Sequence, residues 1–259
     1  LCARLRSSNI DASSGTVEEL ERIVGRIRQA WPDTIIVIRA DSGFCREQIM
    51  AWCECNTVHY VLGLAKNSRL VAEIRDELAQ AKTLFEQRGE PARLFRDFIY
   101  RTRDSWSCSR RVVGKAEHLE KGSNPRFVVS SIEPDRIDAQ ALYEDVYCAR
   151  GEMENRIKEQ QLQMFADRTS CTKMRANQIR LWFSAVAYTL LETFRRLGLA
   201  GTAMARAQCS TIRLKLFKIG ACIKISVRRI LVSLASGCPY AGIFATVWGN
   251  LKALTPLRC

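Results

Sequence analysis

The stretch TIIVIRADSGFCREQIMAWCECNTVHYVLGL, residues 34–64, decides the fold class of this chain. It begins with a β-branched run, Thr34–Ala40, which is typical of a strand buried on both faces. A turn at Ser42-Gly43 and a short helix from Arg46 to Cys55 follow, and Val58–Leu64 is a second apolar strand. The order strand, helix, strand predicts an α/β fold with right-handed crossovers and a parallel central part of the sheet.

The segments on either side of this stretch extend the α/β pattern. Residues Cys2–Arg6 alternate between apolar and charged, which predicts a strand. Thr16 and Glu19 have the spacing of a capping box and predict the start of a helix. On the other side, Leu70 to about Gln87 has the periodicity of a long helix.

In the second half of the chain, the pattern of apolar and charged residues changes three times. A period-two pattern over residues 89–135 predicts a β-rich insert. Helical patterns follow from Ala139 to about Met164 and from Asn177 to Leu197, and the basic tail has a strand-like run, Ile212–Ile230. We therefore expect four parts: residues 1–88 and 136–200 as two portions of one core, 89–135 as the insert, and 201–259 as a basic C-terminal extension.

Charge and composition narrow the classes of partner and chemistry. The 259 residues contain 40 Lys and Arg against 27 Asp and Glu, a net charge of +13, which favours polyanions. No apolar run approaches the roughly 20 residues that span a bilayer, and Arg4 and Arg6 interrupt any signal peptide, so nucleic acid is a better partner than a membrane. The 11 cysteines form no CxxC pair and there are only two histidines, so we expect reduced thiols and chemistry carried by carboxylates.

The segment YCARGEMENRIKEQQ, residues 147–161, holds the most informative set of polar residues. In a uniform α-helix at 100° per residue, one face presents Tyr147, Arg150, Glu154, Lys158 and Gln161. A carboxylate between two cations could hold a metal while the cations grip a phosphodiester. The alternative is a solvated helix face with i,i+4 ion pairs.

Asp41 is the second candidate, because it follows a buried strand at the position where open α/β sheets bind ligands. Its alternative role is to cap the turn into the next helix. Asp41 and Glu154 together could hold a divalent metal, although a two-metal phosphodiester site usually has a third acidic ligand.

These residues carry a resemblance to a known family. Tyr147-x2-Arg150-x3-Glu154 is similar to the Tyr/Arg/Glu signature of the DDE transposases of bacterial insertion sequences. The segments ADSGF (40–44), YVLGLAKNSRL (60–70) and 147–161 resemble the class called transposase DDE domain, group 1, and the similarity runs from Leu1 to about Arg229. The resemblance implies an α/β, ribonuclease-H-like core interrupted by a β-rich insert.

The resemblance also implies roles for particular residues. Asp41 corresponds to the second acidic residue of the triad and Glu154 to the third, and both would bind Mg²⁺ or Mn²⁺. Tyr147 and Arg150 would act on the backbone of the transposon end. The place of the signature's lysine is taken by Gln161, so Lys158 is the expected phosphate contact.

Two further expectations concern the insert and the first acidic residue. In the insert, Arg110 and Arg111 are expected to contact DNA, whereas Trp106 is expected to pack within the sheet more readily than to stack on a base. No early residue matches the first catalytic Asp, since Asp11 lies in a turn. We therefore expect that the chain starts on a later strand of the core and that the isolated polypeptide is inactive.

The function that follows is Mg²⁺-dependent DNA cleavage and strand transfer at insertion-sequence ends. The expected partners are double-stranded DNA, as transposon ends and as target, and a second copy of the chain in a homodimer. The expected location is the bacterial cytoplasm, in association with the nucleoid. Two alternatives remain open: a DNA-binding transposase remnant without chemistry, and a ribonuclease-H-like nuclease unrelated to transposition.

Overall fold

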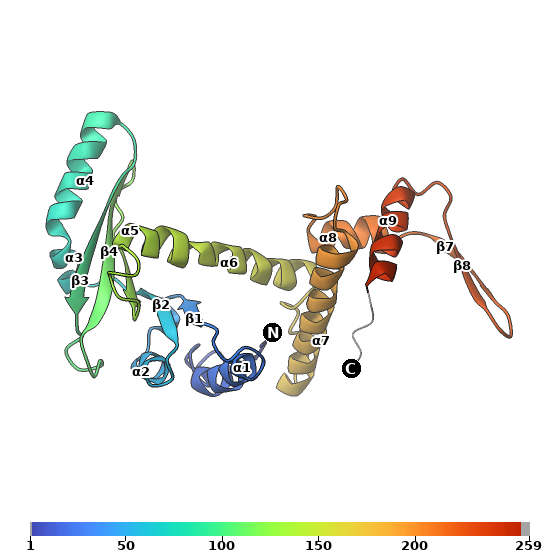
Figure 1. The fold of residues 1–259 in the computed structure, drawn as a ribbon, viewed down its shortest axis with the longest axis horizontal. Helices are drawn as coiled ribbons and strands as arrows, with labels where there is room; N and C mark the ends of the chain where they lie inside the picture. The colour runs from blue at the N-terminus through green and yellow to red at the C-terminus, as the bar shows by residue number, and fades with distance from the viewer. Residues whose placement is uncertain (1, 255–259) are drawn as a thin grey trace. The chain divides into compact units, whose positions relative to one another are not determined.

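The chain forms two compact units. The computed structural model describes residues 2–254, without the side chain of Arg150. Arg6–Glu152 form the sheet unit, and the described residues before Arg6 together with those from Met153 onward form the helical unit. Each unit has a hydrophobic core of its own, and Figure 1 labels helices and strands of both.

A six-stranded mixed sheet is the centre of the sheet unit. Five strands lie in the order β1-β2-β6-β4-β3, and the short β5 pairs with β4. Strands β1 and β2 are parallel and the other pairs are antiparallel, so the α/β class is confirmed. The parallel pair lies at one edge of the sheet, however, and not in its centre as predicted. The strand bounds are β1 Val37–Ala40, β2 His59–Leu64, β3 Ala92–Tyr100, β4 Arg110–Leu119, β5 Gly122–Ser123 and β6 Arg126–Ser130.

Strand β2 has apolar side chains at successive positions because both faces of the sheet are covered. Tyr60 and Leu62 belong to a core that includes residues of helices α1 (Thr16–Ala30) and α2 (Glu47–Cys55). Val61 belongs to a second core on the opposite face, together with Leu142 and Tyr143. All three β2 side chains have no exposed area, and each such burial stabilises the fold by roughly 1.5–3 kcal/mol.

Four local predictions differ from the structure. Strand β1 begins only at Val37 and is partly exposed, because it lies at the edge of the sheet with a single neighbour. The described residues before Ser8 form no strand. Helix α1 begins after Gly15, which has a φ of 73°, and no side chain caps it. The segment predicted as one long helix forms two helices, α3 (Ser68–Glu73) and α4 (Arg75–Arg88).

The predicted β-rich region is real, but it is not a separate layer. Strand β6 pairs with β2 on one side and β4 on the other, and Leu64 is paired with Phe127. The sheet therefore joins residues of the predicted first part, 1–88, to those of the predicted insert, 89–135. The sequence pattern identified strands but could not show which strand each would neighbour.

Among the described residues, the helical unit contains four α-helices, three π-helical segments (Glu159–Gln163, Phe194–Gly198 and Arg213–Phe217) and a hairpin. The bounds of the α-helices and strands are α6 Gly151–Lys158, whose first two residues belong to the sheet unit, α7 Met174–Thr193, α8 Cys209–Ile212, α9 Ala241–Ala253, β7 Ala221–Ile225 and β8 Ile230–Leu234. The core joins α7, α8 and α9 through residues such as Leu191, Ile212 and Val247. The predicted run over 212–230 is only partly a strand, because residues 213–217 are helical.

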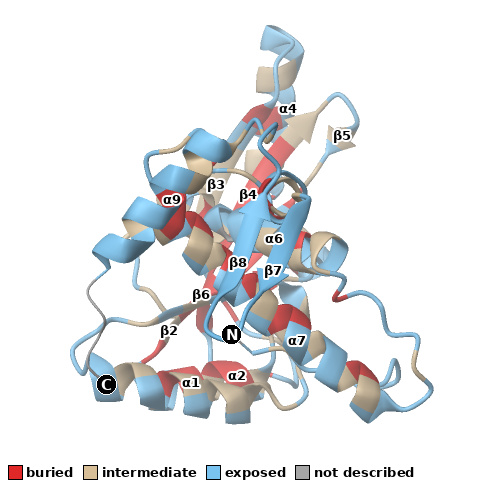
Figure 2. Ribbon diagram, turned by 90° about the vertical axis from the view of Figure 1, so that its right-hand side faces the viewer, coloured by how far each residue is buried: buried red, intermediate tan, exposed pale blue. Residues whose placement is uncertain are grey.

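The β7–β8 hairpin is exposed along its whole length (Figure 2). Its register places Ile223 opposite Val232 and Ile225 opposite Ile230, so one face of the hairpin is apolar. Across residues 2–254, none of the helices combines the length and apolar character that crossing a bilayer requires.

Candidate functional site

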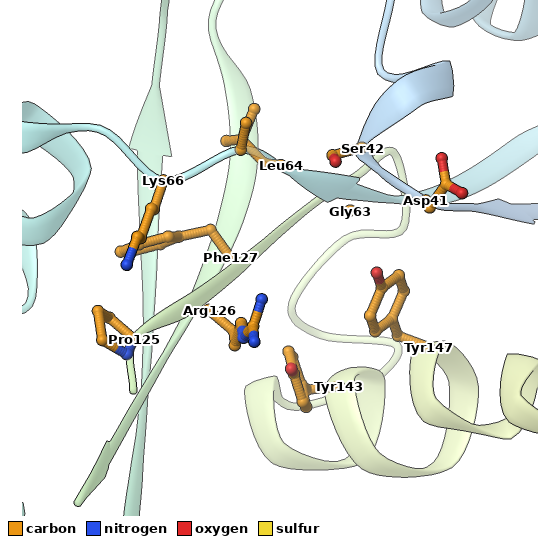
Figure 3. Close-up of a pocket in the computed structure, with 11 residues that line it drawn as sticks. Asp41, Ser42, Gly63, Leu64, Lys66, Pro125, Arg126, Phe127, Tyr143 and Tyr147 are labelled. Atoms are coloured by element: carbon orange, nitrogen blue, oxygen red, sulfur yellow. The ribbon is translucent and has the colours of Figure 1, made fainter. Parts of the chain in front are cut away.

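A pocket of about 300 Å³ lies in the sheet unit where β1 and β2 end and β6 begins (Figure 3). Parallel strands β1 and β2 bring their carboxyl ends to one edge of the sheet, and the antiparallel β6 starts at the same edge. A π-helical segment, Leu142–Tyr147, supplies the remaining residues. The lining residues are Asp41, Ser42, Gly63, Leu64, Ala65, Lys66, Pro125, Arg126, Phe127, Tyr143 and Tyr147.

Asp41 combines the two roles that its position in the sequence allows. It is the N-cap of the short 3₁₀ helix Ser42–Phe44, and its Oδ1 accepts a hydrogen bond of 2.8 Å from the backbone N–H of Gly43. Its Oδ2 has no hydrogen-bond partner in the described part of the chain. The cap therefore fixes the carboxylate while leaving one oxygen for a ligand.

Tyr147 enters the pocket because a glycine lies opposite it. A Cβ atom added to Gly63 would lie 2.6 Å from the Tyr147 hydroxyl and 3.0 Å from the backbone nitrogen of Ser42. The tyrosine ring is also close to that of Tyr143, with 5.6 Å between ring centroids. The missing side chain at position 63 thus lets the helical segment approach the end of β2.

We expect Gly63→Ala to lower the free energy of unfolding by about 1–3 kcal/mol, because the added methyl group overpacks the contact with the Ser42 backbone. Gly25→Ala is the matched control, since no atom lies within 4 Å of its added Cβ in helix α1. That control should gain roughly 0.5–1 kcal/mol from its helix position. Urea denaturation compares the two, and equal effects would contradict the close approach.

The signature helix is not uniform, so the predicted single face holds only in part. Tyr147 ends the π-helical segment, Cys148–Arg150 is a 3₁₀ turn, and α6 begins at Gly151. Because these helix types rotate by different angles per residue, the even spacing of 100° applies within α6 alone. There Glu154 and Lys158 are exposed and one turn apart.

The structure divides the predicted site residues between the sheet unit and the helical unit. Asp41 and Tyr147 line the same pocket in the sheet unit. Glu154 and Lys158 belong to the helical unit. The side chain of Arg150 lies outside the described residues.

Arg110 and Arg111 are buried within the sheet unit, which argues against the predicted DNA contact. The Arg110 guanidinium forms ion pairs with Glu47 at 2.8 Å and with Glu54 at 2.6 Å. Arg111 pairs with Asp97 at 2.7 Å and donates to two backbone carbonyls. Their side chains are only 3% and 5% exposed, so both arginines have a structural role and cannot reach a phosphate without breaking these pairs.

The environment of Arg110 shifts the ionisation of its partners. Burial by itself raises the pKa of Glu54, but hydrogen bonds from Arg110 and Tyr60 outweigh it and hold that pKa below its ordinary value. The ring of Trp106 lies beside the same guanidinium, 5.5 Å from centroid to carbon, and is 5% exposed. The packing role predicted for Trp106 is confirmed.

Two thiols of the sheet unit, Cys45 and Cys53, are held in their protonated form. Burial raises the pKa of Cys45 to about 11 and that of Cys53 to about 12, so neither thiol is ionised near neutrality. Within residues 2–254, no group of three or more His, Cys, Asp or Glu side chains could hold a metal ion.

Sequence reasoning missed three residues of the pocket: Lys66, Arg126 and Tyr143. Lys66 follows the buried strand β2 as Asp41 follows β1, so the same argument from strand ends could have found it. Arg126 begins a strand, and its place depends on the pairing of β6 with β2, which has no local signal in the sequence.

Comparison with known proteins gives a family for the whole chain. The family model described as transposase DDE domain group 1 matches residues 1–256, and no curated protein matches. DDE transposases are enzymes of DNA transposition and recombination, they act on DNA, and they generally use divalent metal ions. Because the match covers nearly every residue, the chain belongs to the transposase DDE domain group 1 family.

Proposed function

We propose that this chain catalyses cleavage and strand transfer of DNA at the ends of a bacterial insertion sequence, with the aid of Mg²⁺ or Mn²⁺. Membership of the DDE transposase family is the observation that carries the proposal. The pocket supports it, because Asp41 presents a carboxylate at the end of two parallel strands beside Tyr147. We further propose a ribonuclease-H-like core, a homodimer that brings two DNA ends together, and association with the nucleoid.

Asp41 and Glu154 are the proposed metal-binding carboxylates. The donor chemistry fits a hard cation, since Mg²⁺ is commonly held by one or two carboxylates together with substrate phosphates and water. The free Oδ2 of Asp41 fits this use, because the Gly43 N–H occupies only Oδ1. A bound ion would supply positive charge to stabilise the displacement at phosphorus.

The other proposed residues position the DNA. The Tyr147 hydroxyl lies in the pocket with Asp41 and can donate a hydrogen bond to a phosphate oxygen. Arg150 can grip a phosphate through two parallel hydrogen bonds, and Lys158, one turn beyond Glu154, can act as a point charge. In this scheme the carboxylates serve the reacting phosphate and the other three residues hold the strand.

Cleavage of DNA that carries the terminal repeats flanking the gene tests the proposal. The full chain should cut this DNA at the repeat ends and join the ends to a target when Mg²⁺ is added, and a chelator should abolish both products. If the full chain gives no product, the expectation that the isolated polypeptide is inactive, which follows from the missing match for the first catalytic Asp, is confirmed instead. Asp41→Asn and Glu154→Gln should reduce both products to background, because each keeps the side-chain shape and removes the charge.

The matched controls are Asp33→Asn and Glu90→Gln, which change exposed carboxylates outside the pocket. They should retain the activity of the unmodified chain. DNA binding that weakens steeply with salt, without any product, would overturn the proposal in favour of a DNA-binding protein without chemistry. Cleavage without strand transfer would instead support the nuclease alternative.

A further inference from the structure

We propose that Lys66 and Arg126 form a phosphate-binding pair that holds the DNA backbone at the end of the pocket opposite Asp41. This inference rests on the proposed function, because it names the substrate group that the pocket takes. It assigns two residues that lie outside the Tyr/Arg/Glu signature. It also implies a path for the DNA backbone, which would run across the pocket from Asp41 toward Lys66 and Arg126.

The first support is the arrangement of the pocket. Lys66 lies two residues beyond the end of β2, and Arg126 is the first residue of β6, which pairs with β2 at Leu64 and Phe127. In Figure 3, Asp41 and Tyr147 lie toward one end and Lys66 toward the other, and the Arg126 guanidinium points into the space between the strands and the helical segment. Both cations are exposed.

The second support is that Lys66 and Arg126 have no acidic partner among the described residues, whereas neighbouring cations do. Arg93 and Lys115 pair with Glu117 at 2.7 and 2.6 Å. Lys115 is the register partner of Arg126 on the neighbouring strand, yet Arg126 has no ion pair with any described residue, and neither has Lys66. Asp41 is the single acidic residue among the described residues that line the pocket.

The third support is chemical. An arginine guanidinium binds two phosphate oxygens at once, and a lysine adds a flexible point charge. The pair therefore suits a phosphodiester of the DNA backbone, whatever the base sequence. The Phe127 ring lies beside Lys66, and Tyr143 lines the middle of the pocket, with 5.6 Å between its ring centroid and that of Tyr147. Both rings offer apolar contact to a deoxyribose. DNA backbone, with its evenly spaced phosphates, can occupy both ends of such a pocket at once.

Salt-dependent DNA binding in the presence of a chelator tests the pair without any catalytic readout. The probe is a short fluorescein-labelled duplex, and the variant is Lys66→Ala combined with Arg126→Ala in the full chain. The slope of log affinity against log salt should fall by about 0.9 for each phosphate contact that is lost. The duplex should also slow the acetylation of Lys66 measured by mass spectrometry.

The matched control is Lys121→Ala combined with Arg103→Ala, which removes the same charges from exposed sites of the sheet unit outside the pocket. Thermal unfolding should be unchanged in both double variants. The inference is overturned if the two double variants lose the same slope, or if DNA does not protect Lys66. Metal-dependent cleavage is measured separately: if cleavage is absent but the slope falls only in the pocket variant, the proposed function fails while the phosphate pair stands.

Discussion

Arg110→Ala is expected to lower the free energy of unfolding of the sheet unit by about 3–5 kcal/mol, because it leaves two carboxylates without their buried partner. Arg110 links strand β4 to both ends of helix α2 through Glu47 and Glu54. Glu54 also accepts a hydrogen bond from Tyr60 of β2 at 2.6 Å. Removal of the guanidinium therefore weakens the contact between a helix and two strands at once.

Hydrogen exchange followed by mass spectrometry measures this effect, because it reports the two units separately. Amides of α2 and β4 should exchange faster in the variant. Arg103→Ala, at an exposed loop position, is the control and should leave exchange unchanged. If Arg110→Ala weakened DNA binding but kept the exchange rates of the unmodified chain, the structural role would be refuted and a DNA contact restored.

Glu159→Ala is expected to destabilise the helical unit by a similar amount, about 3–5 kcal/mol. Its carboxylate is 7% exposed and accepts hydrogen bonds from Arg195 at 3.1 Å and from the backbone N–H of Cys209 at 2.6 Å. The Tyr188 hydroxyl donates a further bond at 3.4 Å. One side chain thus joins helices α7 and α8 and the π-helical segments at Glu159–Gln163 and Phe194–Gly198.

The ionised form of Glu159 is the one that stabilises the fold. Burial alone raises its pKa, but the hydrogen bonds from Cys209 and Arg195 outweigh burial and lower the pKa below its ordinary value of 4.5. Because the folded-state pKa is the lower one, this stabilisation is present above about 4.5 and is lost as the pH falls through the folded-state value. A Glu159→Gln variant should accordingly lose part of the stability at neutral pH.

Glu154→Ala is the matched control for Glu159→Ala, five positions earlier on the same helical stretch. Glu154 is exposed, and an exposed carboxylate contributes little to stability, about 1 kcal/mol at most. Chemical denaturation should therefore show a large loss for Glu159→Ala and a small one for Glu154→Ala. Equal losses would contradict the assignment of a structural role to one and a chemical role to the other.

The parts of the fold that could be predicted are those with local signals. Apolar residues at successive positions identified Val58–Leu64 as a strand covered on both faces, and the strand-helix-strand order predicted its parallel pairing with β1. The place of β6 between β2 and β4 could not be predicted, because it depends on contacts between residues more than sixty positions apart, such as Leu64 with Phe127.

In the candidate site too, residues with a local sequence signal could be predicted and residues placed by distant contacts could not. Asp41 could be found because the end of an apolar, β-branched run is a local feature of the sequence. The burial of Arg110 and Arg111 could not be predicted, because their acidic partners come from α2 and β3, which lie elsewhere in the sequence. The change of helix type between Tyr147 and Gly151 has no local signal in the sequence, and it alters which residues share a face.

The exposed β7–β8 hairpin affects how the protein behaves at high concentration. Each of its strands has a single partner, so the outer edge of each offers unpaired backbone groups to another chain. The apolar face around Ile223 and Val232 adds side-chain contacts that favour stacking of such ribbons. Arg228 and Arg229 at the tip oppose this by charge repulsion, so the colloidal stability of the purified chain depends on ionic strength through these two residues.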